Sequence, residues 1–259
     1  MSHQLSVIRT SDRPGTATTH AGLQLQLLGG FRLEVAGVPV ALPTHAKRVL
    51  VYLAVSSRAQ AGCSRLLLAD QLWSESDGER AQASLRTALW RIRQVDRRLL
   101  AVEQDSVRLG DAVQVDLHGA LDQAGRLLQH NTVLRAGDTA IPPLSSELLP
   151  GWDEDWLLLE RERVHQLQLH ALDTLAARLR RQGRYSEAVN AALTSITIDP
   201  LRESARRELI AAHVAEGNLA AAHGQFDDYA TALWAELRLR PSPGLATLLT
   251  AVGQNQPTA

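Results

Sequence analysis

The chain has 259 residues, enough for one large or two ordinary domains. It is 45% hydrophobic and only 4% aromatic, with a formal net charge of −1, a composition typical of a mainly helical protein. Cys63 is the single cysteine, which excludes a disulfide framework and a cysteine zinc site, and we expect it to be a small buried residue in a reducing cytoplasm. No run of about eighteen apolar residues occurs, which excludes a membrane-spanning helix.

Charge is distributed unevenly along the chain. Residues 23–110 hold 12 Lys and Arg against 8 Asp and Glu, whereas residues 111–259 hold 13 against 19. A basic N-terminal half joined to an acidic C-terminal half indicates an anionic partner at one end only. Residues 1–22 are polar and lack the apolar core of a signal peptide, so we expect a disordered tail on a cytoplasmic protein.

Three short strands are predicted first, because apolar and polar residues alternate between glycine turns in segments 23–30, 31–35 and 38–42. Thr44 is the predicted N-cap of a helix that runs to about Ser57. The residues expected on the inward face of this helix are Val49, Leu50, Leu53 and Ala54.

A second helix is predicted after a break at Gly62, with Ser64 as its N-cap and Trp73 at its end. We expect Trp73 to pack in the core. The residues expected on the buried face of this helix are Leu67, Leu68 and Leu72. A short acidic loop, 74–78, leads to the next helix.

The segment Glu79–Arg98, with the sequence ERAQASLRTALWRIRQVDRR, is the most informative part of the chain. One of its faces is apolar at helical spacing, formed by Leu85, Leu89, Ile92 and Val95. The segment holds six arginines against two acids. A helix that buries one face and presents arginines with short hydrogen-bonding side chains on the other suits the major groove of DNA. The alternative is an ordinary solvent-exposed helix.

A hairpin is predicted next, with strands at 99–103 and 107–109, followed by an extended segment at 113–117. Three strands, three helices and a terminal hairpin in this order make a winged helix, in which the third helix is the recognition helix and the hairpin is the wing. Arg108 in the wing is expected to reach a phosphate or the minor groove, the alternative being a solvent-exposed strand residue.

Several sequence blocks occur in a characteristic order, namely LLGGF at 27–31 with VAG at 35–37, KRVL at 47–50, LADQLW at 68–73 and SLRTALWRIR at 84–93. In order and spacing they resemble the Streptomyces antibiotic regulatory protein (SARP) family of bacterial activators, over roughly residues 23–253. The resemblance implies a winged helix like the output domain of two-component response regulators, followed by a bacterial transcriptional activator domain. The wing departs from it, with Ser106-Val107-Arg108-Leu109 where the family usually has Gly-Tyr-Arg-Leu.

From about Asp116 the chain is predicted to be helical, with a first helix at 117–129. A long irregular link at 131–150 precedes a long helix that begins within 151–156 and ends at about Gln182. The apolar positions of the long helix are Val164, Leu167, Ala171, Leu172, Leu175 and Leu179. The acids near its start, Asp153, Glu154 and Asp155, are interpreted as helix-start residues that complement the helix dipole.

An internal repeat follows, because Gly183 and Gly217 open two similar segments 34 residues apart, the period of tetratricopeptide (TPR) repeats. We expect each glycine to make the turn within a helix pair, and Ala188 and Ala222 to lie where helices cross closely. Such pairs stack and leave a concave side for a partner. A loop at 240–243 leads to a last helix at 244–252, and 254–259 form a tail.

No motif for catalysis or cofactor binding occurs. The nine histidines form no H-E-x-x-H pair, and the chain has no glycine-rich phosphate loop and no G-x-S-x-G elbow. We therefore expect no enzyme activity, no metal and no cofactor.

These patterns predict a mainly α protein whose α+β N-terminal part is a winged helix-turn-helix. The expected division is a disordered tail at 1–22, a winged-helix DNA-binding domain at 23–112, a TPR-like helical activator domain at 113–253 and a tail at 254–259. The expected function is sequence-specific DNA binding and transcriptional activation. The expected DNA-binding residues are Ser84, Arg86, Thr87, Trp90, Arg91, Arg93, Arg97, Lys47, Arg48 and Arg108.

Within this set, Arg86 and Trp90 are expected to form the edge that contacts bases, with Arg93 and Arg97 on a second edge near phosphate. By the resemblance, the protein forms dimers on promoter direct repeats and recruits RNA polymerase holoenzyme, with the loop at 75–78 as a candidate contact, and it associates with the nucleoid. Two alternatives stay open: a helical-repeat adaptor that binds protein and no DNA, and a regulator that senses a small molecule or peptide on its concave surface.

Overall fold

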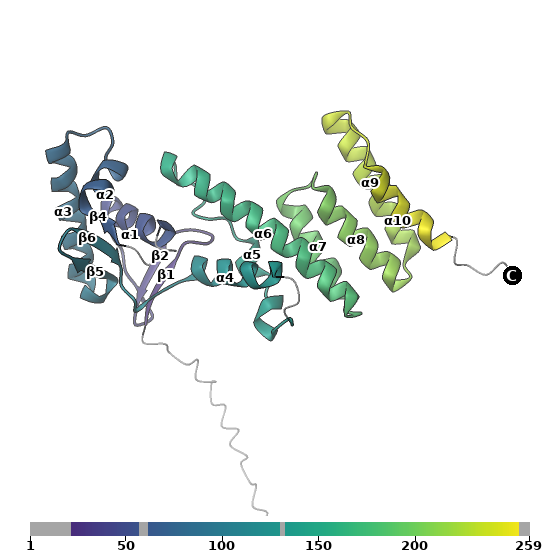
Figure 1. Ribbon diagram of the computed structural model, residues 1–259, viewed down its shortest axis with the longest axis horizontal. Coiled ribbons are helices and arrows are strands. Elements are labelled where there is room, and N and C mark those ends of the chain that lie inside the picture. The colour runs from purple at the N-terminus through teal and green to yellow at the C-terminus, as the bar shows by residue number, and fades with distance from the viewer. Residues whose placement is uncertain (1–21, 57–61, 130–132, 254–259) are drawn as a thin grey trace, which may run out of the picture.

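The computed structural model describes residues 22–56, 62–129 and 133–253. The tails expected at 1–22 and 254–259 lie outside the described residues, except for Gly22. The molecule is elongated, with a small module of strands and helices at one end and a row of stacked helices extending to the other (Figure 1). This arrangement confirms the expected fold class, an α+β N-terminal part followed by a helical region.

A four-stranded sheet opens the fold, in the order β3-β2-β1-β7. Its strands are β1 (Leu23–Gln26), β2 (Arg32–Val35), β3 (Val38–Pro39) and β7 (Val113–Val115). β1 and β2 are antiparallel, whereas β7 pairs in parallel with β1 and places Val115 opposite Leu25. The third strand is shorter than the expected 38–42. The parallel pair brings the segment after the wing back to the start of the fold.

Three helices pack in the N-terminal module: α1 (Thr44–Ser56), α2 (Arg65–Leu72) and α3 (Gly78–Val95). The four inward residues predicted for α1 are buried, and Ser64 caps α2 by accepting a hydrogen bond from the Leu67 N–H at 3.1 Å. The prediction that Leu67 is buried is wrong, since 49% of it is exposed. The short α2 contacts the core through Leu68, Ala69 and Leu72 instead.

The apolar stripe of α3 is buried as predicted at Leu85, Leu89 and Ile92, whereas Val95 at the helix end is half-buried. A short 3-10 turn, η2 (Arg97–Leu99), follows α3. Arg97 therefore lies beyond α3, contrary to the helical segment expected to extend to residue 98.

The predicted hairpin is present as β5 (Leu100–Glu103) and β6 (Ser106–Leu109). An unpredicted two-residue strand, β4 (Cys63–Ser64), joins it by pairing with β6. Cys63 is half-buried, not buried as expected, and burial raises the pKa of its thiol. Gly110 closes the hairpin by donating its N–H to the Leu99 carbonyl at 2.9 Å. A Cβ there would lie 1.9 Å from the Arg98 carbonyl oxygen, so the position requires glycine.

The helical half begins with α4 (Asp116–Leu128), as predicted. The segment 131–150, expected to be an irregular link, contains two short helices within its described part, η3 (Ala136–Thr139) and α5 (Pro142–Ser145). Leu148 also forms a bridge with Leu28 in the N-terminal module. The prediction failed because four-residue helices have too few positions to show periodicity.

The remaining helices are α6 (Asp155–Arg181), α7 (Tyr185–Ile198), α8 (Glu203–Glu216), α9 (Leu219–Leu237) and α10 (Pro243–Gly253). Gly183 and Gly217 adopt φ angles of +75° and +87° at the turns of the α6–α7 and α8–α9 pairs, as predicted. Ala188 and Ala222 are fully buried where the helices cross. Across the described ranges, no helix is both long and apolar enough to cross a membrane.

One apolar core spans the N-terminal module and the start of the helical half. Besides the strands and α1–α3, it contains Leu148, Leu149, Leu157 and Val164. The helical row has separate apolar clusters farther along the chain. The N-terminal core therefore extends past residue 112, where we expected the first domain to end.

Candidate nucleic-acid interface

The outer face of α3 presents polar and aromatic side chains to solvent. Arg86, Thr87, Trp90, Arg91 and Arg93 are exposed. Trp90 is 52% exposed although it is a large aromatic residue. The buried stripe fixes the rotation of α3 about its axis, and these five side chains consequently point away from the core. Ser84, also predicted as a contact, is half-buried.

The arginines lie along two edges of this face. At about 100° per residue, positions 86 and 93 differ by two nearly complete turns and share one edge, whereas Arg91 lies on the other edge. The expected division, with Arg86 on one edge and Arg93 and Arg97 on another, is therefore wrong. Helix geometry joins Arg93 to Arg86, and Arg97 lies in η2.

Two contacts within α3 restrict side chains in the middle of its outer face. The Arg91 guanidinium lies over the Trp90 ring, 4.9 Å from its centroid. The Thr87 hydroxyl donates a hydrogen bond to the Ala83 carbonyl at 3.0 Å. Both contacts lie within α3, and they order side chains that would otherwise be free to rotate.

A groove of about 410 Å³ separates the Arg91 edge of α3 from the start of α1. Its polar lining comes from His45 on α1 and from Ser84, Thr87 and Arg91 on α3. The His45 ring nitrogen Nδ1 accepts a hydrogen bond from the Trp73 indole N–H at 3.3 Å. Of these side chains, Ser84 and Arg91 can donate hydrogen bonds to an anionic backbone, whereas the Thr87 hydroxyl donates within α3.

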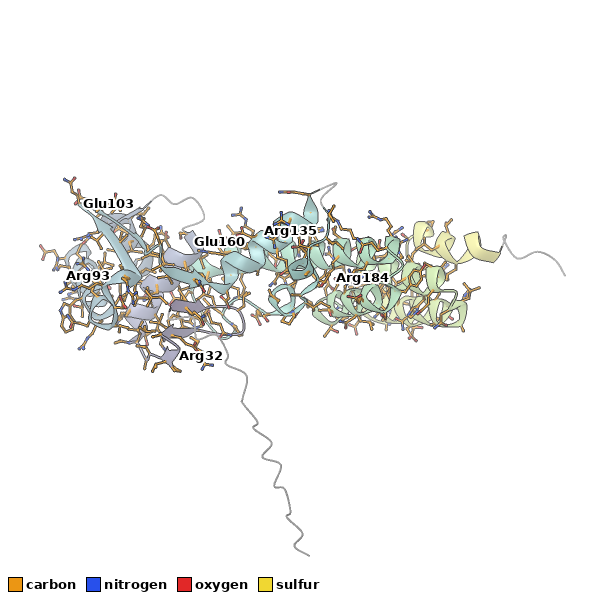
Figure 2. All side chains as sticks on the ribbon, turned by 90° about the horizontal axis from the view of Figure 1, so that it is seen from below. Arg32, Arg93, Glu103, Arg135, Glu160 and Arg184 are labelled. Carbon is orange, nitrogen blue, oxygen red and sulfur yellow. The ribbon has the colours of Figure 1, made fainter. Side chains whose placement is uncertain are left out.

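The wing lies at the same end of the molecule as the outer face of α3. Figure 2 shows Arg93 on α3 and Glu103 on β5 projecting from this end. Arg108 is half-buried and pairs with Asp111 at 2.5 Å, and this pairing raises the pKa of the arginine and lowers that of the carboxyl. A phosphate would compete with Asp111 for Arg108.

The two basic residues predicted on α1 have partners inside the protein. Arg48 donates from Nη2 to Glu154 Oε2 at 2.8 Å, and its Nε lies 2.7 Å from Glu154 Oε1. Its guanidinium also lies 5.7 Å from the Trp73 ring centroid. Lys47 is half-buried, with its ammonium 5.4 Å from the Phe31 ring centroid. Sequence reasoning interpreted Glu154 only as a helix-start residue and missed its role in joining α1 to the start of α6.

Further contacts join the two halves beside this ion pair. Trp152 stacks on Phe31 with a centroid distance of 6.0 Å, and Trp156 packs edge-on against Tyr52 at 5.1 Å. Asp116 accepts backbone N–H bonds from Leu27 at 2.8 Å and Leu28 at 3.0 Å, although its burial raises the pKa of the carboxyl. The module that carries α3 is thus held to α4 and α6.

Comparison with known proteins identifies the family to which this chain belongs. The profile of the bacterial transcriptional activator domain matches residues 116–252, more than half of the chain. The chain belongs to this family. This match agrees with the resemblance to the SARP family that the sequence implied.

This chain is 27% identical over 260 residues to the regulatory protein AfsR of Streptomyces coelicolor, and the match covers 94% of the chain. It spans about a quarter of that relative's length, 25%. Its fold is similar to that of Mycobacterium tuberculosis EmbR, solved in complex with a low-affinity phosphopeptide. The TM-score is 0.67 at 21% identity, covering 92% of this chain and 66% of that one.

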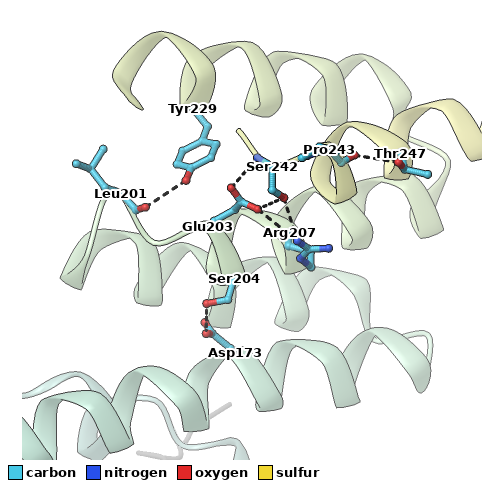
Figure 3. A network of polar contacts seen from close by, with 9 residues as sticks. All are labelled: Asp173, Leu201, Glu203, Ser204, Arg207, Tyr229, Ser242, Pro243 and Thr247. Carbon is cyan, nitrogen blue, oxygen red and sulfur yellow. Dashed lines mark hydrogen bonds and ion pairs between the residues drawn. The ribbon is translucent and has the colours of Figure 1, made fainter. Parts of the chain in front are cut away.

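Polar clusters between the helices stabilise the helical half of the protein. On α6, Asp173 accepts hydrogen bonds from Ser195 at 2.9 Å, Arg202 at 2.9 Å and Ser204 at 2.7 Å, and so links three helices. Figure 3 shows the bond from Ser204. Within the described ranges, no three His, Cys, Asp or Glu side chains gather closely enough to hold a metal ion.

A second cluster attaches α10 to α8. Glu203 accepts hydrogen bonds from the Ser242 N–H at 3.0 Å, from the Ser242 hydroxyl, and from Arg207 at 3.3 Å (Figure 3). Burial raises the pKa of the Glu203 carboxyl, but the Ser242 bonds and the Arg207 charge outweigh that effect, and the pKa is lowered. The cluster favours the ionised carboxylate.

Proposed function

We propose that this activator binds double-stranded promoter DNA sequence-specifically by placing α3 in the major groove. The observation that carries the proposal is the outer face of α3, where three exposed arginines flank an exposed tryptophan while the opposite stripe is buried. Major-groove recognition requires a helix whose polar face is free and whose orientation is fixed by its scaffold. The basic charge of residues 23–110 supports the same partner.

The proposed contacts fall into two groups. Arg86 and Arg93 on one edge, and Arg91 on the other, are placed to bind base edges or the adjacent phosphates. The remaining proposed contacts are Ser84, Thr87, Trp90, Lys47, Arg97 and Arg108. Arg48 is left out of the set, because its guanidinium is paired with Glu154 at the junction.

Recruitment of RNA polymerase and pairing of two copies on direct repeats belong to the same proposal. The loop between α2 and α3 is exposed at residues 74–77, beside the recognition helix, and is available to a neighbouring protein on the promoter. The helical row provides the larger surface for a second copy. Such a protein would act in the cytoplasm, associated with the nucleoid.

The test uses the full chain and random-sequence duplexes from which bound DNA is selected, followed by gel shifts on the selected site. We expect Arg86→Ala and Arg91→Ala each to weaken binding roughly 5- to 150-fold, equivalent to about 1–3 kcal/mol for one arginine–base contact. Arg163→Ala is the control, because this α6 side chain is 67% exposed and pairs with Glu160, its neighbour on the same helix. Wild-type affinity in both α3 variants would show that this face does not bind DNA. Failure to select any duplex would favour the protein adaptor.

A further inference from the structure

We propose that α3 reads the C5 methyl groups of thymine through an apolar line in the middle of its recognition face. The line consists of Ala83, Thr87 and Trp90. The inference rests on the proposed function, because it names the chemical group in DNA that the same face recognises. It also gives Thr87 and Trp90 a different task from the hydrogen-bonding arginines beside them.

The three residues share one line because they are four and three positions apart on a helix. All three are exposed, on the side of α3 opposite to Leu85 and Ile92, which are buried. Arg86 lies on one side of the line and Arg91 on the other. Between residues 83 and 90 the face is therefore apolar along its centre and cationic along both edges, and Gln94 continues the line with a polar side chain.

Thr87 belongs to the apolar line because of its hydrogen bond. Its hydroxyl donates to the Ala83 carbonyl at 3.0 Å, within the helix. The hydroxyl proton is thus used inside α3, which leaves the γ-methyl as the part of the side chain without an internal partner. The sequence suggested a hydrogen-bonding threonine, whereas the structure presents a methyl group.

Trp90 supplies most of the apolar surface. It is 52% exposed, so about half of this large side chain lies outside the core. Arg91 covers its ring at 4.9 Å. This contact limits the positions that the indole can adopt and keeps it available at the centre of the face.

In the major groove, the thymine methyl is the apolar group that distinguishes one base pair from the others, and alanine, threonine methyl and aromatic groups are its usual partners. Arginine pairs with the O6 and N7 atoms of guanine. A face with a central apolar line and arginine edges fits a half-site with thymine at its centre and guanine beside it.

The experiment replaces thymine by uracil, one position at a time, in the duplex selected by the full chain. This substitution removes one methyl group and preserves every hydrogen bond. We expect one or two positions in each half-site to bind about fourfold more weakly, the change expected for one buried methyl group. Other thymines should tolerate the replacement.

Variants of the protein identify the methyl's partner. Thr87→Ser keeps the hydroxyl and removes the methyl. Thr87→Val keeps the methyl and replaces the hydroxyl by a second methyl. We expect the serine variant to lose discrimination at one uracil-sensitive position and the valine variant to retain it. Trp90→Ala should abolish discrimination at a sensitive position. Trp234→Ala is its matched control, because Trp234 is 49% exposed and also has an arginine, Arg238, over its ring at 5.8 Å.

The outcomes separate the inference from the proposed function. If the chain selects duplexes but binds uracil and thymine equally at all positions, the proposed recognition of thymine methyl groups is wrong and the proposed DNA binding stands. Discrimination that survives in Thr87→Ser and Trp90→Ala also overturns it, because the methyl would then contact another residue. If no duplex is selected, the proposed DNA binding itself is wrong.

Discussion

Replacing Arg48 by methionine should destabilise the protein by about 2 kcal/mol. Its pair with Glu154 has one hydrogen bond of 2.8 Å and a second close approach of 2.7 Å between Nε and Oε1, and the two side chains are 20% and 18% exposed. Breaking one partner of a buried pair costs about 3–5 kcal/mol, whereas fully exposed pairs contribute about 0–1 kcal/mol. The partial exposure of this pair places it between these limits. Methionine keeps much of the arginine's apolar stem, so the change mainly removes charge and hydrogen bonds.

Urea unfolding followed by tryptophan fluorescence measures this effect directly. Trp73 lies beside the Arg48 guanidinium, and the Trp156 indole N–H donates to Glu154 at 3.0 Å, so both report on the junction. A double-mutant cycle of Arg48→Met and Glu154→Gln should give a coupling energy of about 1–2 kcal/mol. The matched control is the pair Arg32–Glu34, which has a similar distance of 2.8 Å but an arginine side chain that is 57% exposed. Its coupling should stay below about 1 kcal/mol.

Two results would refute this reasoning. A coupling energy no larger than that of the control pair would show that the ion pair does not hold the halves together. The salt dependence of DNA binding provides the second check. Loss of one phosphate contact reduces the slope of log affinity against log salt by about 1. We expect no such change for Arg48→Met, and observing it would return Arg48 to the DNA contacts.

Three further changes test other parts of the structure. Gly110→Ala should destabilise the wing by more than about 2 kcal/mol in urea unfolding, because its Cβ would overlap the Arg98 carbonyl, and wild-type stability would contradict the hairpin geometry. Glu203→Gln should lower the thermal midpoint at pH 7 and have a smaller effect at pH 3. The folded pKa of Glu203 is lowered, so its contribution is complete above the unfolded value of about 4.3 and is lost as the pH falls through the folded one; an equal effect at both pH values would exclude this linkage. A fragment of residues 23–112 should lack a cooperative unfolding transition, because it omits β7 and the core residue Leu157, and a cooperative transition as strong as that of the full chain would show a self-sufficient domain.

The helices and their faces were largely predictable from the sequence. The periodic leucines of α3 and the glycines at 183 and 217 report local geometry, because the helix period and the left-handed turn are properties of neighbouring residues. The β5–β6 hairpin was likewise predictable, from the alternation of apolar and polar residues along its strands. Short elements were missed, since two residues in β4 and four in α5 contain no period to detect.

Predictions about individual side chains depended on contacts far along the chain. Leu67 has the same character as Leu68, and the packing of the module leaves the first exposed and buries the second. Glu154 lies at the start of a helix, where acidic residues are common, and its partner Arg48 on α1 is 106 residues away in the sequence. No periodic signal connects two such positions.

The sequence by itself determined that a helix with one apolar stripe carries arginines on its remaining surface, and that helix pairs with a 34-residue period follow. Both properties arise from residues within a few turns of one another. Only the tertiary structure decided which basic side chains stay available to a partner. Ion pairs such as Arg48–Glu154 form when folding brings distant segments together, and this removes Arg48 from the DNA contacts while Arg86 and Arg91 remain exposed.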